Sequence, residues 1–379
     1  QLTATELELA GASGVAVPQI DAATLSILAS YDPLADGTID LQEIDIRLGE
    51  ALSIQGRGKV GWELVTGVAS AIDELDLTIV SRPRQLALLA TGTDGFGATT
   101  IEGPITTGIM VHRRGRSLTD YTLSIDATEA TFHRAGQVLK PVGRSLRARA
   151  EGRYNDRNDY CALTSWEASL GDNTFRGQCR IRSFATWRSQ WSGALIGDSQ
   201  VLLAQLARVQ GAAWGELSDW TALREFTPEL AGVWERLAIA GEVRVNGLLQ
   251  FDPSRRIKLM ATIPADTVVT YGDAFRKPAG TAMTATCVAG IDPAAGALSD
   301  VDCELLYGDG EIRINKGLLQ LPAERLISQD RTSFTGDLSV RQVETFVACF
   351  PPSMLKPSLP ALNPVGEFRG RVLWRSAAP

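Results

Sequence analysis

Apolar side chains recur at every second residue along much of this chain, and this period of two constrains its fold more than any other feature. Leu75, Leu77 and Ile79 alternate with polar residues. The same alternation occurs in three further segments: Tyr121, Leu123, Ile125 and Ala127; Ile257, Leu259, Ala261 and Ile263; and Val301, Cys303, Leu305 and Tyr307. Alternation over about four to eight residues predicts β-strands with one apolar and one polar face.

Short polar connections separate these segments, such as Gly171-Asp172-Asn173 and Gly308-Asp309-Gly310. Such connections are typical of hairpins, so we expect antiparallel strands. A helical period occurs in only three places: Leu202, Leu206 and Val209; Leu230, Val233, Trp234 and Leu237; and Val343, Phe346, Val347 and Phe350. We therefore predict a mainly β fold, an elongated and curled antiparallel sheet with a few amphipathic covering helices.

The chain also contains an internal repeat. Lys140-Pro141-Val142-Gly143 recurs as Lys277-Pro278-Ala279-Gly280, and 277 − 140 gives an offset of 137. Gly171-Asp172 recurs as Gly308-Asp309 at the same offset, and Leu48-Gly49-Glu50 is a weaker copy upstream. Repeated sheet-plus-helix units indicate an extended architecture. The predicted domains are a first β-unit at 1–130, a second with a helix at 131–215, a helical junction at 216–240, and a third with a helix and the start of another unit at 241–379.

Charge and motif content argue against several classes of function. Lys plus Arg number 37 and Asp plus Glu 44, a net charge of −7, whereas nucleic-acid binding needs a basic face. No apolar run reaches about 18 residues, so we expect no transmembrane helix here. The chain lacks a nucleophile elbow, a zinc-protease motif and a P-loop, so we expect neither an enzyme nor a cofactor. Gly56–Gly61 spells G-x-G-x-x-G without a β-α-β context, and we interpret it as a strand connection.

Five cysteines are present, and none lies in a C-x-x-C motif. Bridges between Cys161 and Cys179 and between Cys287 and Cys303 are conceivable, because each pair lies in or beside a hairpin. The two pairs do not occupy matching repeat positions, and we favour structural thiols in apolar rows. The chain begins at Gln1 rather than Met, so we expect a mature or excised piece of a longer protein.

A weak alternative is a calcium loop between residues 32 and 43. Asp32, Asp36, Asp40 and Glu43 match the ligand spacing of that loop, but Leu34 stands where an oxygen ligand is required. The flanking residues alternate as strands, whereas an EF-hand needs helices. We therefore favour a hairpin turned at Asp36-Gly37 and expect no metal.

The repeated unit resembles the AsmA/TamB-like family of Gram-negative envelope proteins. The resemblance runs from Lys140-Pro141-Val142-Gly143 to Leu202, and again from Lys277-Pro278-Ala279-Gly280 to Phe350. Pro364–Val372 looks like the start of another unit. The resemblance implies a membrane-anchored, periplasmic protein that carries phospholipid to the outer membrane in an apolar β-groove. It also implies an inner-membrane anchor outside this segment and an envelope or outer-membrane protein partner, and it supplies no catalytic residues.

Physical reasoning leads to a similar expectation. An antiparallel sheet with one apolar face must cover that face, close into a sandwich, or leave the face for a ligand. An acyl chain on such a face gains about 0.8 kcal/mol per buried methylene, without any polar motif. The candidate groove residues are Leu75, Leu77, Ile79, Tyr121, Leu123, Ile125, Ile257, Leu259, Ile263, Val301 and Leu305. The alternative is a structural or adhesive β-sandwich scaffold, with or without calcium at 32–43.

Overall fold

The computed structural model describes residues 2–7, 20–32, 38–61, 72–91, 99–115, 117–134, 137–185, 208–227, 231–250, 256–292, 297–320, 333–347, 349 and 366–375. The protein is mainly β, and four short helices lie among these residues. The chain forms two compact units. Unit 1 comprises residues 1–172 and 221–228, and unit 2 comprises residues 173–220 and 229–379.

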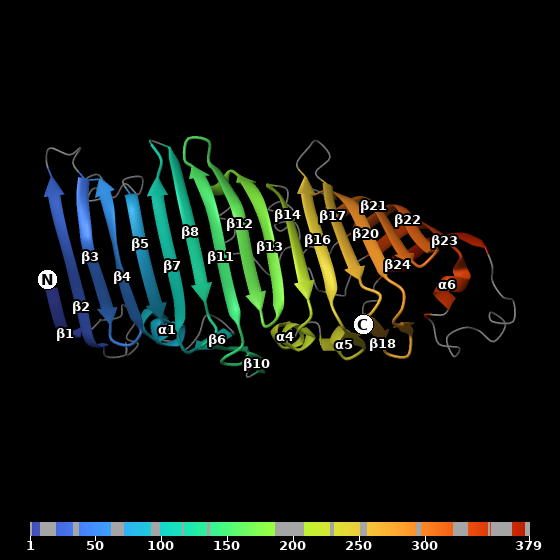
Figure 1. Ribbon diagram of the computed structural model, residues 1–379, viewed down its shortest axis with the longest axis horizontal. Coiled ribbons are helices and arrows are strands. Elements are labelled where there is room, and N and C mark those ends of the chain that lie inside the picture. Colours follow the sequence, from blue (N-terminus) through green and yellow to red (C-terminus); the bar gives the residue numbers. More distant parts are fainter. Residues whose placement is uncertain are drawn as a thin grey trace. The chain divides into compact units, whose positions relative to one another are not determined.

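The main sheet of unit 1 is antiparallel and does not close on itself (Figure 1). Its strands pair in the order β1-β2-β3-β4-β5-β7-β8-β11-β12. The elements of this unit are β1 (Leu2–Leu7), β2 (Ile20–Asp32), β3 (Thr38–Leu48), β4 (Leu52–Gly61), β5 (Ile72–Ser81), α1 (Pro83–Thr91), β6 (Thr99–Glu102), β7 (Ile105–Arg113), β8 (Leu118–Asp126), β9 (Thr131–Arg134), β10 (Gln137–Lys140), β11 (Leu146–Asn155) and β12 (Tyr160–Leu170). Most of α4 (Trp220–Phe226) also belongs to unit 1.

The main sheet of unit 2 is built in the same way, in the order β13-β14-β16-β17-β20-β21-β22-β23-β24. The elements of this unit are β13 (Asn173–Arg182), β14 (Val209–Leu217), α5 (Ala231–Trp234), β15 (Leu237–Ala240), β16 (Val243–Gln250), β17 (Arg256–Ile263), β18 (Val268–Tyr271), β19 (Phe275–Lys277), β20 (Met283–Asp292), β21 (Ala297–Tyr307), β22 (Gly310–Gln320), β23 (Ser333–Arg341), α6 (Val343–Val347) and β24 (Glu367–Arg375). The predicted antiparallel sheet with few helices is therefore confirmed.

Each unit carries one further sheet of three short strands. In unit 1 this sheet has the order β6-β9-β10, and in unit 2 it has the order β15-β18-β19. In Figure 1 the short strands and the helices of each unit lie at the ends of the long strands. They therefore form the rim of the sheet and do not make a second layer over its middle.

The sequence offset of 137 is also an offset in strand register. Leu146 of β11 lies opposite Leu170 of β12, and Met283 of β20 lies opposite Tyr307 of β21, so both pairs are separated by 137. The glycine of each G-D or G-E turn, Gly49, Gly171 and Gly308, has a positive φ. A side chain is strained in that conformation, which explains why all three turns use glycine.

The lysine of the first K-P-x-G motif is completely buried. Lys140 ends β10, and its Nζ donates to the carbonyl oxygens of Thr128 at 2.9 Å, Ala130 at 2.6 Å and Pro141 at 3.1 Å. Burial lowers the pKa of Lys140, because desolvation disfavours the charged form. The three carbonyl oxygens offset that cost by solvating the ammonium group.

Unit 2 repeats this lysine cage, the name used here for a buried Lys Nζ and its three carbonyl acceptors. Lys277 ends β19, and its Nζ donates to the carbonyl oxygens of Pro264 at 3.0 Å, Thr267 at 2.6 Å and Pro278 at 3.2 Å. Burial lowers its pKa as well. The K-P-x-G motif thus ties the last strand of the small sheet, or the strand next to it, to the segment that leads out of a main-sheet strand, β8 in unit 1 and β17 in unit 2. Its lysine replaces water as the donor to buried carbonyls there.

The best-defined core of unit 2 also lies at the rim. Phe346 of α6 is buried with Met283, Tyr307 and Cys349, and the rings of Tyr307 and Phe346 have centroids 6.2 Å apart. Because α6 begins directly after β23, this short helix places its one large buried side chain beside the ends of β20 and β21.

Three local predictions need correction. Leu237 was expected in the same helix as Trp234, but α5 ends at Trp234 and Leu237 begins β15. Leu230 and Phe350 of the predicted helices lie outside the described residues. Val209 was assigned to a helix but begins β14, while Leu202 and Leu206 lie outside the described residues. Its strand pairs with β13 and β16, so tertiary pairing overrides the local helical period. Gly56–Gly61 lies inside β4 and is not a connection.

Candidate ligand-binding face

The candidate residues of unit 1 lie on one face of its sheet. Leu77 of β5 is opposite Ile109 of β7, which is opposite Leu123 of β8. Two parallel rows flank this one, Leu75–Val111–Tyr121 and Ile79–Thr107–Ile125. The structure therefore brings together all six candidates of this unit as a continuous surface, which we call the apolar face of unit 1.

The apolar face extends to residues that are not among the candidates. The central row continues through Gly56, Ile44 and Ile27, and a neighbouring row through Ile54, Ile46 and Leu25. Residues 25–29 and 44–48 were considered only as the flanks of the calcium loop, although their alternation is the same as in the candidate rows.

Much of this face is accessible. Leu25 is 38% exposed, Ile27 46%, Leu123 37% and Ile125 36%. Central residues of a sheet sandwiched between two layers would be almost completely buried. This face therefore presents a contiguous apolar surface that a ligand or partner can cover.

The candidates of unit 2 also share one face of their sheet, which we call the apolar face of unit 2. Leu259 is 51% exposed at its centre. Ile257 lies two residues from it along β17 and has the same orientation. By contrast, Val301 is buried, and Ile263 and Leu305 pack against the rim core around Phe346. Among the candidates of unit 2, the accessible ones therefore lie on β17.

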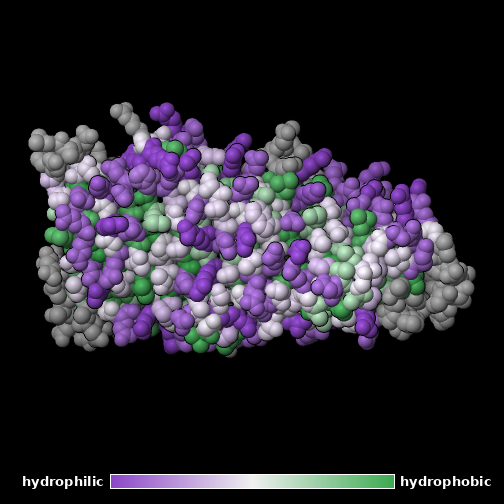
Figure 2. All heavy atoms as spheres, in the orientation of Figure 1, coloured by the Kyte–Doolittle hydropathy of each residue, from purple (hydrophilic) through white to green (hydrophobic). Residues whose placement is uncertain are grey.

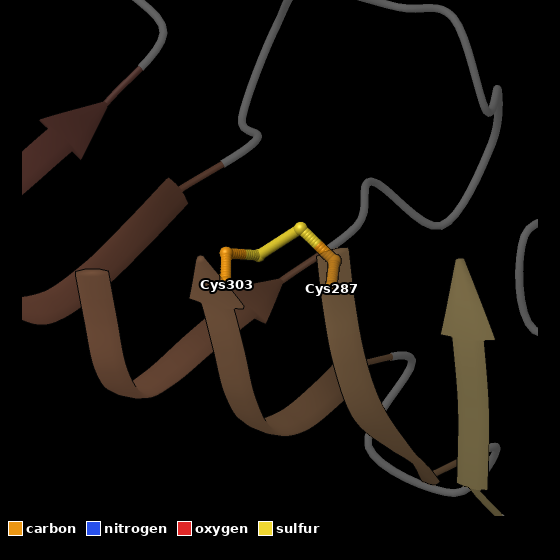
Figure 3. The surroundings of a disulfide bond; sticks show 2 residues. All are labelled: Cys287 and Cys303. Atoms are coloured by element: carbon orange, nitrogen blue, oxygen red, sulfur yellow. A yellow bond between two sulfur atoms is a disulfide. The ribbon is translucent and has the colours of Figure 1, made fainter. Parts of the chain in front are cut away.

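A disulfide lies on the apolar face of unit 2. Cys287 of β20 and Cys303 of β21 are directly opposite each other and are bonded (Figure 3). The preference for free thiols was therefore wrong for this pair, because strand register places the two side chains side by side. Leu259 lies opposite Cys287 on the other side, so the disulfide continues an apolar row. The corresponding positions of unit 1 are Ala150 and Trp166, which also face each other.

Cys161, Cys179 and Cys349 form no disulfide. The Sγ of Cys161 lies 3.0 Å from the hydroxyl oxygen of Tyr121. Burial raises the pKa of Cys161, since desolvation disfavours the thiolate. This thiol is therefore a packing residue with low nucleophilicity.

Glycines let neighbouring strands approach closely on the apolar face of unit 1. A Cβ atom on Gly56 would lie 2.1 Å from the carbonyl oxygen of Asp76 and 2.6 Å from a methyl carbon of Leu77. At Gly152 a Cβ would lie 2.4 Å from the Tyr121 hydroxyl. Glycine at such positions permits a bend of the sheet. The glycines of β4 are therefore explained by strand packing and not by nucleotide binding.

The opposite face of each sheet, called the polar face here, carries ion pairs, although exposed apolar side chains such as Met110 and Leu306 also lie on it. In unit 1, Arg147 pairs with Asp126 at 3.0 Å and Arg153 with Asp120 at 2.8 Å. In unit 2 a series of ion pairs crosses β21 to β24, formed by Glu304, Arg313, Glu311, Arg341, Glu367 and Arg369. Hydrophilic residues are spread over both units in the view of Figure 2. Exposed ion pairs of this kind contribute little stability, and they mark the solvated face.

An EF-hand calcium loop needs a helix on each side, but the residues on both sides of 32–43 form strands. Asp32 ends β2, and Asp40 and Glu43 lie within β3, with Glu43 opposite Leu28. Asp36 and Gly37 lie outside the described residues. Within the described part of the chain, no three His, Cys, Asp or Glu side chains are grouped so that they could hold a metal ion.

Comparison of the chain with protein-family models, curated proteins and solved structures gave no match. No helix among the described residues is long and apolar enough to cross a membrane.

Proposed function

We propose that this chain is a segment of an envelope lipid-transport protein, in which the apolar faces hold phospholipid acyl chains and conduct them across the periplasm. One observation carries the proposal: rows of apolar side chains cross several strands in each unit, and parts of these rows stay accessible, with Leu259 51% exposed and Ile27 46% exposed. An acyl chain lying along such rows gains about 0.8 kcal/mol per methylene and needs no polar anchor.

The Cys287–Cys303 disulfide supports a periplasmic location. Disulfides persist in oxidising environments such as the periplasm and are rare in the cytosol. The AsmA/TamB resemblance favours the same location, with a membrane anchor contributed by sequence outside this segment.

A paired substitution tests the proposal. Leu259 and Leu306 are 51% and 40% exposed, but register places Leu259 on the apolar face and Leu306 on the polar face. Leu259→Asp puts an unpaired carboxylate in the acyl path, which costs several kcal/mol. We expect it to weaken phospholipid binding to the apolar face of unit 2 by about tenfold or more, since 1.4 kcal/mol corresponds to tenfold, and so to lower the co-purified amount. Leu306→Asp should retain the wild-type amount.

Phospholipid is measured by mass spectrometry of organic extracts, normalised to protein, after circular dichroism has established that each variant is folded. In unit 1, Leu123→Asp and Met110→Asp form the corresponding pair on opposite faces, with exposures of 37% and 47%. Wild-type protein free of phospholipid, or equal losses for both members of a pair, would contradict lipid binding and favour the scaffold interpretation.

A further inference from the structure

Trp214 stands on the polar face of unit 2. It lies within β14, directly opposite Asn246 of β16, and this row continues across the sheet to the ion pair of Glu304 and Arg313. The side chain is 44% exposed, although tryptophan is highly buried on average in folded proteins. Because strand side chains stand roughly perpendicular to their sheet, the indole projects from the side that carries the ion pairs.

Among the described residues, Trp214 has no hydrogen-bond or ring partner that explains a tryptophan at this position. Trp220 differs, since its Nε1 donates to the carbonyl oxygen of Gly241 at 2.9 Å. Tryptophan is enriched at recognition hot spots, because its ring combines a large rigid surface with one polar group. The exposed ring and the Nε1 donor of Trp214 are therefore available to an external ligand.

The side chains around this indole are mostly polar and planar. Arg176 of β13 and Asn246 flank Trp214 on its two sides, at the spacing of directly opposed residues, about 5 Å between Cβ atoms. Within the described part of the chain, the Asn246 side chain has no hydrogen-bond partner. Ala212 precedes Trp214 by two residues on the same face, and its small side chain leaves space beside the ring. The further polar neighbours on this face are Thr174, Gln178, Glu216 and Arg244.

This combination of side chains fits a sugar ring. A pyranose whose substituents are all equatorial presents two flat faces of axial C–H groups, and such a face packs well on an indole. The hydroxyl groups at the edge of the sugar need both donors and acceptors, which guanidinium, amide and carboxylate groups provide. A β-1,4-linked chain of such sugars is extended and flat, so it can lie on the open face of a sheet.

Two other classes of ligand fit these residues less well. Single-stranded nucleic acid also stacks on aromatic rings, but it needs a positively charged groove. Here Glu216 lies on the same face of β14 as the indole, and Arg244 is paired with Glu242 at 2.6 Å. An acyl chain would cover the charged and amide groups without offering them hydrogen bonds, which is costly.

We propose that Trp214 is the stacking platform of a glycan-binding site on the polar face of unit 2. Arg176 and Asn246 bind the polar substituents of the stacked sugar. The ligand class is a β-1,4-linked glycan with equatorial hydroxyl or acetamido groups, and an acetamido group offers the Asn246 amide a matching donor and acceptor. The site lies on the face opposite Leu259, so it is independent of the proposed lipid binding.

The probe is chitohexaose, the β-1,4-linked hexamer of N-acetylglucosamine, titrated into the whole chain by isothermal calorimetry. We expect saturable binding that Trp214→Ala weakens at least about tenfold. Trp214→Tyr should keep most of the affinity, because it retains a planar ring. Trp214→Leu should lose as much as Trp214→Ala, because leucine supplies apolar area without a flat face. Asn246→Ala should also weaken binding, since it removes a donor and an acceptor from the sugar edge.

Two control variants should bind chitohexaose like wild type, after circular dichroism has established that every variant is folded. Met110→Ala removes an apolar side chain that is 47% exposed on the polar face of unit 1, and Leu259→Asp changes the apolar face of unit 2. No binding of chitohexaose, or equal affinities of Trp214→Ala and wild type, would overturn the proposal. Equal affinities of Trp214→Leu and Trp214→Tyr would do so too, and so would tighter binding of a thymidine hexanucleotide than of chitohexaose.

Discussion

Replacing Phe346 by alanine is expected to lower the free energy of unfolding of unit 2 by about 3–5 kcal/mol. The ring is 4% exposed and packs with Met283, Tyr307 and Cys349. It fills its site closely, because a Cβ atom on Gly310 would lie 2.5 Å from a ring carbon. The substitution removes this burial and leaves a cavity that the strand ends can only partly close.

Denaturant unfolding followed by tryptophan fluorescence and far-ultraviolet circular dichroism measures this loss. Phe368→Ala is the control, because the same atoms are removed from a side chain that is 54% exposed. We expect the control to change stability by less than about 1 kcal/mol. Equal effects of the two substitutions would contradict the assignment of Phe346 to the core.

Replacing Lys277 by methionine is expected to cost about 2–4 kcal/mol, although methionine is the more apolar residue. Three carbonyl oxygens would lose their donor, and each unsatisfied buried acceptor costs about 1–3 kcal/mol. Removal of a desolvated charge offsets part of that loss. The net effect is destabilising because the three acceptors belong to the backbone and cannot be removed with the lysine.

Lys258→Met is the matched control, since Lys258 is an exposed residue of β17. The free energy of unfolding of this variant should stay within about 0.5 kcal/mol of wild type. Lys140→Met in unit 1 should reproduce the loss, because its Nζ also has three carbonyl acceptors. If thermal or denaturant unfolding shows that Lys277→Met is as stable as wild type or more stable, the three carbonyl oxygens do not need the lysine as their donor.

Strands and their faces could be predicted from the sequence because a period of two is visible without knowledge of strand partners. Leu77 and Leu123 were selected from separate segments, and register then placed them in one row through Ile109. The alternation does not distinguish apolar residues that stay exposed from those that are buried. Leu259 and Val301 have the same pattern, yet one is 51% and the other 7% exposed, because burial depends on what lies over each strand.

Features set by register or by the rim were not predictable from the sequence. The Cys287–Cys303 bond requires the two residues to be directly opposite across β20 and β21, and a shift of one residue would place them on different faces. The lysine of K-P-x-G identified the repeat, but two of the three carbonyl groups that it binds in each unit are ten or more residues away. Periodicity contains no information on such contacts.

The two lysine cages also give the protein an internal reporter in each unit. Amine-reactive reagents modify exposed lysines such as Lys258 readily, whereas Lys140 and Lys277 are fully buried and their Nζ hydrogens are engaged by carbonyl oxygens. Labelling at these two positions should therefore occur only when the local rim opens. Timed labelling followed by peptide mass spectrometry would measure separately how often the rim of unit 1 and the rim of unit 2 open. The measurement uses the wild-type sequence and needs no engineered probe.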